Sequence, residues 1–254
     1  MPTPNPSHQV VVVIPARYDS VRFPGKPLAQ IAGKSMIQRV YEQARKAESV
    51  NKVIVATDDE RILKAVKDFN GEAIMTRHDH HVGTERVAEV AAHLNAEIYI
   101  NVQGDEPLTD PIAIEALVQA LNDDSTVGIA TPCTPIRKLD EIMDPNIVKV
   151  VLDFEENALY FTRAPIPWVR DTGEHVAARH LKHIGMYAFR RDALIDYPTL
   201  PPGELERLEQ LEQLRWLENG YKIRTVEVDY EAVSVDVPSD VLRVEEILRQ
   251  RTEN

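Results

Sequence analysis

The sequence has one cysteine, Cys133, in 254 residues. A single cysteine excludes a disulfide within the chain, fits a reducing compartment and is by default a buried structural thiol. No apolar run approaches the ~20 residues that span a bilayer, and the polar segment 1–8, expected to be flexible, lacks the apolar core of a signal peptide. These absences predict a cytoplasmic protein.

Positive charge is also scarce, since 29 basic residues stand against 41 acidic ones and give a formal charge of −12. This balance disfavours nucleic acid or an anionic membrane as the main partner, so any anionic ligand must be held by local positive charge. Internal repeats, low-complexity segments and flexible linkers are absent from the sequence. We therefore expect one α/β domain over 1–254, and the hydrophobic content of 43% is enough for its core.

Short apolar segments alternate with amphipathic ones, which predicts a mainly parallel sheet with helices on both faces. The expected strands are 10–15, 52–57, 72–76, 97–102, 127–132, 147–153, 183–190 and 222–228. The expected helices are 36–44, a helix opening at 57–60, and then 84–94, 110–122, 204–219 and 238–251. Prolines disturb the alternation within 131–195, which we interpret as an inserted subdomain that offers substrate contacts or a dimer surface.

A basic loop follows the first expected strand. The apolar run Val10–Ile14 leads into a segment with three cations, Arg17, Arg22 and Lys26, and one acid, Asp19. The carboxyl end of a buried strand, ahead of a helix, is where α/β proteins bind phosphate groups. The segment therefore predicts a phosphate site, with a solvated turn as the alternative.

Two acids follow later apolar segments. Asp105 comes after the strand 97–102, and Asp236 comes after a short β-like run and before the helix 238–251. Each acid alone fits an ordinary turn or helix cap. Beside the basic loop, Asp105 is well placed to hold Mg²⁺ bound to a nucleoside triphosphate, and Asp236 is a second candidate ligand if Ser239 or Asp240 caps the helix.

Leucine recurs at every third residue in 205–217, so the apolar stripe of the expected helix drifts around its axis. Glu212 and Arg215 fall inside this stripe, where charged groups need partners. They could pair with each other or reach into a ligand site.

Histidine occurs in two settings. His183 enters an apolar run and is a candidate for function, with a buried structural histidine as the alternative. His78, His80 and His81 lack the spacing of a closed tetrahedral metal site, so we interpret them as loop residues.

Several motifs stand in a fixed order along the chain: Pro15–Tyr18, Phe23–Leu28, Ala56–Asp58, Gly83–Arg86, Asn101–Pro107, Tyr160–Ala164, His183–Tyr187 and Leu211–Arg215. Through them the chain from Val10 to Leu248 resembles the sugar-acid cytidylyltransferases, and among these the 3-deoxy-manno-octulosonate (Kdo) cytidylyltransferase, or CMP-Kdo synthetase, family. The resemblance implies a Rossmann-like twisted sheet of the nucleotide-diphospho-sugar transferase type, with an inserted subdomain for dimerisation or substrate, and a cytoplasmic homodimer.

The resemblance also implies transfer of CMP from CTP to the anomeric hydroxyl of Kdo, with Mg²⁺ as cofactor and pyrophosphate as leaving group, for lipopolysaccharide biosynthesis. The positions that match CTP contacts are Arg17, Ser20, Arg22, Lys26, Arg77 and Gly83. Asp105 and Asp236 match the metal carboxylates, and together with Lys26 they match the catalytic set. The positions that match sugar-acid contacts are Gln103, Arg163, His183, Tyr187, Glu212 and Gln213.

Four positions depart from the motifs that are usual in this family. Val82, Glu85, Val237 and Ser239 stand where Ser, Asp, Thr and Glu are usual. The alternatives that stay open are 8-amino-Kdo as substrate, another sugar nucleotidyltransferase, and a nucleotide-binding module without catalysis. Such a module would have little need for two metal carboxylates.

Overall fold

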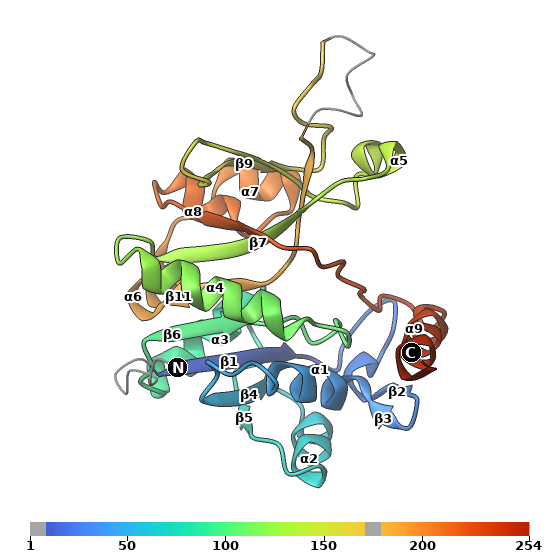
Figure 1. Cartoon of the computed structure of the whole chain (residues 1–254). Coiled ribbons are helices and arrows are strands. Elements are labelled where there is room, and N and C mark those ends of the chain that lie inside the picture. The colour runs from blue at the N-terminus through green and yellow to red at the C-terminus, as the bar shows by residue number, and fades with distance from the viewer. Residues whose placement is uncertain (1–8, 171–178, 254) are drawn as a thin grey trace, which may run out of the picture. The chain divides into compact units, whose positions relative to one another are not determined.

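The computed structural model describes residues 9–170 and 179–253 (Figure 1). The chain divides into two compact units, Met1–Glu115 with Ala232–Asn254 (unit 1) and Ala116–Glu231 (unit 2). The segment 1–8, expected to be flexible, lies outside the described residues. The expected inserted segment 131–195 belongs to unit 2, apart from 171–178, which are not described.

Unit 1 is built on a parallel sheet with the strand order β5-β4-β1-β6. Its strands are β1 (Val10–Ala16), β4 (Lys52–Thr57), β5 (Ala73–Met75) and β6 (Ile98–Asn101). The run Val10–Ile14 is at most 2% exposed, which explains why it is apolar without alternation. The predicted parallel sheet is confirmed in this unit.

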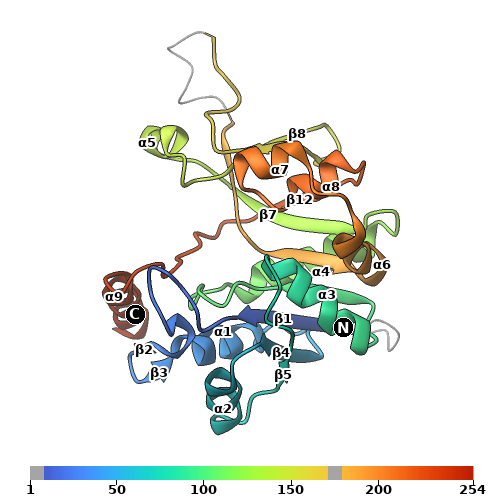
Figure 2. The same ribbon diagram turned by 180° about the vertical axis from the view of Figure 1, so that it is seen from behind.

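Most helices of unit 1 lie between its strands in the sequence, and the last one ends the chain. They are η1 (Lys26–Leu28), α1 (Met36–Ala44), α2 (Glu60–Asp68), α3 (Gly83–His93) and α9 (Asp240–Glu253), with a short hairpin of β2 (Gln30–Ile31) and β3 (Lys34–Ser35) before α1. The connections through α1 and α2 step outward from β1, whereas α3 leads back past β1 to β6. Right-handed crossovers then place α3 on the opposite face from α1, as the two views show (Figures 1 and 2). All four strands end at one edge, where their loops meet.

The chain returns to unit 1 at its end. Val235 and Val244 are fully buried against Ile31, Met36 and Leu108. This small apolar cluster attaches the segment 232–254 to the first helices of the unit, which brings a late part of the sequence beside the loop that follows β6.

Unit 2 has a mostly antiparallel sheet. Its strands are β7 (Ile129–Pro135), β8 (Lys149–Leu152), β9 (Ala158–Thr162), β10 (Leu181–His183), β11 (Tyr187–Arg190) and β12 (Arg224–Glu227), of which only β12 runs parallel to β7. Its helices are α5 (Leu139–Met143), α6 (Arg191–Asp196), η2 (Tyr197–Thr199), α7 (Glu204–Glu209) and α8 (Leu214–Glu218), while α4 (Pro111–Asp123) spans the boundary of the two units. No helix in the described part of the chain is long and apolar enough to cross a membrane.

Two predicted elements of unit 2 are wrong as continuous elements. The strand 183–190 is interrupted, because His183 pairs with Cys133 whereas Ala188 pairs with Ala130, so two extra residues bulge out of the ladder with β7. The helix 204–219 breaks at Gln210, whose φ of 54° is left-handed. The sequence analysis also missed strand β9.

Candidate functional site

In the loop after β1, both the main chain and the ring of Tyr18 make stabilising contacts. The Gly25 N–H donates to the Tyr18 carbonyl over 2.9 Å, and Gly25 has a φ of 71°, where a side chain would be strained. A Cβ on Gly25 would also lie 3.1 Å from the Tyr18 ring. Arg61 of α2 stacks on this ring with its Cζ 3.2 Å from the centroid. The Ser20 hydroxyl accepts the Phe23 N–H over 3.3 Å. Ser20, which was predicted to contact CTP, therefore bonds to the main chain of its own loop.

Lys26 brings the two predicted metal carboxylates together. Its Nζ lies 2.5 Å from Asp105 Oδ2 and 3.7 Å from Asp236 Oδ1. Arg22 donates from Nη2 to Asp236 Oδ1 over 2.9 Å, while Arg17 is exposed. The basic loop and the two acids therefore form one charged group at the carboxyl edge of the parallel sheet.

Main-chain bonds explain how Asp236 reaches Asp105. The Val235 N–H donates to the Asp105 carbonyl over 2.9 Å. Asp240, the first residue of α9, accepts the N–H groups of Asp236 and Val237 over 2.8 and 3.0 Å. These bonds, led by that from Val237, lower the pKa of Asp240 below its ordinary value. Asp240 thus holds the turn that precedes α9, and the Asp236 carboxylate lies beside Lys26.

The chemistry of this group suits Mg²⁺. Two carboxylates from distant segments already share one positive charge, that of Lys26, and both side chains are partly exposed. Within the described residues no group of three or more His, Cys, Asp or Glu side chains that could hold a metal is present. Mg²⁺ is commonly bound through one or two carboxylates, with waters and substrate phosphates completing its shell. Asp105 and Asp236 fit that donor set.

The carboxyl group of Glu106, next to Asp105, is buried. Its Oε2 has no hydrogen-bond partner among the described residues, and the side chain points away from solvent with only 6% of the residue exposed. Burial, with a smaller contribution from Asp105, raises the pKa of Glu106 from 4.5 to about 8. A buried carboxyl group could not be predicted here, because acidic residues in such loops are usually solvated.

We expect Glu106→Gln to change how stability depends on pH. The folded chain keeps the Glu106 proton until about pH 8, whereas the unfolded chain releases it near pH 4.5. Between these values the folded state binds more protons, so the free energy of unfolding falls as the pH rises, by roughly 5 kcal/mol over the whole window. Urea unfolding at several pH values should show a flatter profile for Glu106→Gln. Parallel profiles for variant and wild type would contradict the assignment, and the exposed Glu60→Gln is the control.

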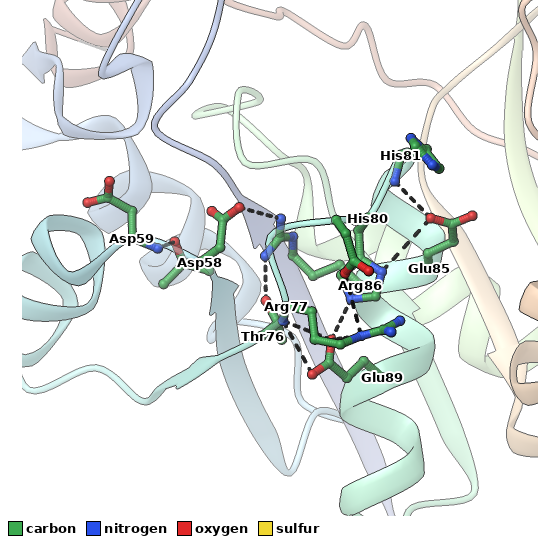
Figure 3. A network of polar contacts seen from close by, with 11 residues as sticks. Asp58, Asp59, Thr76, Arg77, His80, His81, Glu85, Arg86 and Glu89 are labelled. Carbon is green, nitrogen blue, oxygen red and sulfur yellow. Dashed lines mark hydrogen bonds and ion pairs between the residues drawn. The ribbon is translucent and has the colours of Figure 1, made fainter.

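Two carboxylates of α3 fasten the loop that carries Arg77 (Figure 3). Glu89 accepts the Arg77 N–H over 3.1 Å and contacts His80 Nε2, and Glu85 accepts the His81 N–H over 2.8 Å. The Arg77 side chain lies 3.7 Å from Asp79 and 3.8 Å from Glu89. His80 is thus a loop residue as predicted, buried between acids.

The departures at Val82 and Glu85 lie at the start of α3. Val82 is the N-cap residue and offers no side-chain acceptor to the helix that begins at Gly83. Glu85 reaches back to the His81 N–H instead, just outside the helix. Arg86, one residue further, is buried and joins Asp58 Oδ2, at 3.1 Å, to the Thr76 hydroxyl (Figure 3). The motifs at 56–58 and 83–86 therefore hold the loops of this edge together.

Unit 2 contains five of the six residues predicted to bind the sugar acid, and Gln103 belongs to unit 1. His183 and Tyr187 lie with their rings 5.4 Å apart, and Phe161 packs edge-on against His183 at 5.0 Å. Burial lowers the pKa of His183 from 6.5 to about 3. Burial, and to a smaller extent the charge of Glu212, raises the pKa of Tyr187.

Arg163 is fixed by the turn that ends α7. Its Nε donates to the Glu209 carbonyl over 2.8 Å and its Nη1 to the Pro145 carbonyl over 3.0 Å. Glu209 accepts the Arg163 N–H over 2.9 Å and the Thr162 hydroxyl over 2.6 Å. Burial would raise the pKa of Glu209, but these bonds keep it below its ordinary value. Glu209 was not among the predicted site residues, because its only signal in the sequence is its place in an amphipathic segment.

The break at Gln210 places Glu212 outside a helix and Arg215 in a second short helix. Glu212 and Gln213 lie in the short segment between α7 and α8. Arg215 donates from Nε and Nη2 to both oxygens of Glu206 over 2.8 and 2.6 Å. Glu206 is therefore a partner of Arg215 that the sequence did not predict.

The chain is similar to known proteins over most of its length. The cytidylyltransferase family model matches residues 11–223. The 3-deoxy-manno-octulosonate cytidylyltransferase of Syntrophotalea carbinolica is 52% identical over 246 residues, covering 94% of this chain and 98% of the relative. That of Solibacter usitatus is 52% identical over 241 residues and covers 95% of each. A solved structure of CMP:2-keto-3-deoxy-manno-octonic acid synthetase complexed with CTP is 48% identical, with a TM-score of 0.91 over 96% of this chain and 99% of that one.

Proposed function

Because the chain belongs to the 3-deoxy-manno-octulosonate cytidylyltransferase family, we propose that it transfers CMP from CTP to the anomeric hydroxyl of Kdo. The products are CMP-Kdo, for lipopolysaccharide biosynthesis, and pyrophosphate. The observation that carries this proposal is the convergence of Asp105 and Asp236 on Lys26, beside the basic loop. The similar synthetase structure complexed with CTP supports CTP as the nucleotide.

Asp105 and Asp236 would hold Mg²⁺. When bound, Mg²⁺ would neutralise negative charge on the phosphates and favour the ionised form of the attacking hydroxyl. The two carboxylates come from loops of unit 1 that are joined by the main-chain bond from Val235 to Asp105, so their spacing is set before ligands arrive. Such preorganisation is the main way a protein can accelerate phosphoryl-type transfer.

The cations of the loop would stabilise the triphosphate. Lys26 is only 16% exposed, so its charge is weakly screened by water and would offset charge that develops on the leaving pyrophosphate. The exposed Arg17 and Arg22 would bind the outer phosphates, and Ser20, Arg77 and Gly83 complete the proposed CTP contacts. Because these residues act through charge and position, the reaction needs no covalent protein nucleophile.

Five residues of unit 2 would bind the sugar acid, namely Arg163, His183, Tyr187, Glu212 and Gln213. Arg163 supplies a guanidinium for the carboxylate. Tyr187 keeps its proton, because burial raises the pKa of its hydroxyl, and can donate to the sugar. Glu212 and Gln213 offer acceptors and an amide to the sugar hydroxyls. We further propose that the enzyme works as a cytoplasmic homodimer, without nucleic acid or membrane as a partner.

Pyrophosphate release tests this function. We expect release when the protein, CTP, Kdo and Mg²⁺ are all present, and no release when any one of them is left out. Addition of EDTA should stop the reaction, and excess Mg²⁺ should restore it. Release that persists in EDTA would contradict the metal role, and release without any sugar acid would indicate hydrolysis in place of transfer.

A further inference from the structure

The ring of His183 is bound to a threonine of the neighbouring strand. His183 Nε2 lies 2.8 Å from the Thr131 hydroxyl oxygen of β7. The same oxygen lies 2.7 Å from the Met186 carbonyl and 3.4 Å from the Ile184 carbonyl, both within the bulge between β10 and β11. Thr131 is fully buried, so these bonds are not exchanged with water.

The number of hydrogens on Thr131 decides the tautomer of His183. A hydroxyl has one hydrogen, and a carbonyl can only accept, so the Thr131 hydrogen goes to the Met186 carbonyl at 2.7 Å. The contact between Thr131 and His183 then needs a hydrogen on Nε2, which donates to the hydroxyl oxygen. The ring is neutral at pH 7, because burial lowers its pKa to about 3. Its other nitrogen, Nδ1, therefore carries a lone pair and is an acceptor.

A neutral ring with an Nδ1 lone pair selects its ligand. Phe161 and Tyr187 flank the ring at 5.0 and 5.4 Å, and no charged side chain contacts it within the described residues. An acceptor nitrogen attracts a hydroxyl and repels a carboxylate. Lys182 of β10 and Thr162 of β9 both pair with Lys149 of β8, from its two sides. The residues that follow them in the sequence, His183 and Arg163, therefore lie at the same end of this sheet. Strands on either side of β8 lie about 10 Å apart.

We propose that Thr131 is a positioning residue that fixes the Nε2–H tautomer of His183, so that Nδ1 accepts a hydrogen bond from a hydroxyl of the sugar acid and leaves its carboxylate to Arg163. The inference rests on the proposed function for the identity of the ligand. It assigns a chemical role to His183 and a new residue, Thr131, to the sugar-acid group.

NMR of ¹⁵N-histidine-labelled protein reads the tautomer without any substrate. At pH 7 we expect the His183 signals of a neutral ring with hydrogen on Nε2, identified by their loss in His183→Gln. In Thr131→Val this preference should weaken, and in Thr131→Ser it should return. Hydrogen on Nδ1 in the wild type would overturn the proposal, whether or not Kdo proves to be the substrate.

Kinetics test the consequence for binding. We expect Thr131→Val to raise the KM for Kdo roughly threefold to tenfold, with kcat and the KM for CTP within about twofold, and Thr131→Ser to restore the wild-type value. The matched control is Thr225→Val, since Thr225 faces Thr131 in the ladder with β12 and its buried hydroxyl donates to the Glu156 main-chain carbonyl over 2.8 Å. An equal rise in both valine variants, or none in Thr131→Val, would overturn the positioning role. Absence of turnover with Kdo in the wild type would overturn the proposed function and leave the NMR result standing.

Discussion

Asp105→Asn is expected to lower kcat at least about a thousandfold and to leave the thermal unfolding midpoint close to that of the wild type. The substitution removes a proposed metal ligand and the partner of Lys26 at 2.5 Å. Loss of several kcal/mol of transition-state stabilisation corresponds to this factor. Stability should change little, because the Asp105 side chain is 29% exposed and its main-chain bond to Val235 is kept.

Steady-state pyrophosphate release and thermal unfolding measure the two halves of this prediction. Asp19→Asn is the control, because it removes an exposed carboxylate from the same loop region without a part in the proposed site. We expect the control to keep activity within about twofold. Near-normal turnover of Asp105→Asn would remove this residue from the metal site, and a large loss of stability would show that its main role is structural.

Arg215→Ala is expected to lower the free energy of unfolding by about 3–5 kcal/mol, because it leaves a buried carboxylate without its partner. The side chains of Arg215 and Glu206 are only 11% and 12% exposed, and two bonds join them. The guanidinium also lies over the Tyr197 ring at 4.4 Å. Glu206 in turn accepts the Gly203 N–H at the start of α7, so its position matters for that helix.

Chemical unfolding gives the measurement, with Arg137→Ala as the control from the same unit. Arg137 pairs with Asp229 at 3.0 Å, but both side chains are more than 70% exposed at 73% and 89%, so its loss should cost at most about 1 kcal/mol. Equal effects of the two substitutions would show that burial does not strengthen the Arg215 pair.

Features of unit 1 that depend on local pattern could be predicted from the sequence. The run Val10–Ile14 is apolar without alternation, and it forms the central buried strand. The cations that follow it lie at the carboxyl end of this strand, as the general plan of α/β sheets requires. Asp236 was different, because the sequence alone could not place it beside Asp105. Only the apolar cluster around Val235 and the bond from its N–H do so.

The errors in unit 2 have physical reasons of their own. Leucine at every third residue favours a continuous helix. The helix ends instead where Glu209 accepts hydrogen bonds from Thr162 and Arg163, and the next residue, Gln210, is left-handed. The sequence has no glycine there that would have indicated a helix end. The interruption near Gly185 did have a signal, since an isolated glycine within an apolar run is typical of a bulge. In both cases hydrogen bonds to segments distant in the sequence accompany the interruption of the predicted element.

The central claim is the transfer of CMP from CTP to Kdo. The most direct test is a pyrophosphate-release panel that crosses four nucleoside triphosphates with Kdo, 8-amino-Kdo and sialic acid in the presence of Mg²⁺. We expect release with CTP only, and the highest kcat/KM with Kdo. No release with CTP and Kdo, together with release from sialic acid or from a sugar phosphate added to the panel, would contradict the account.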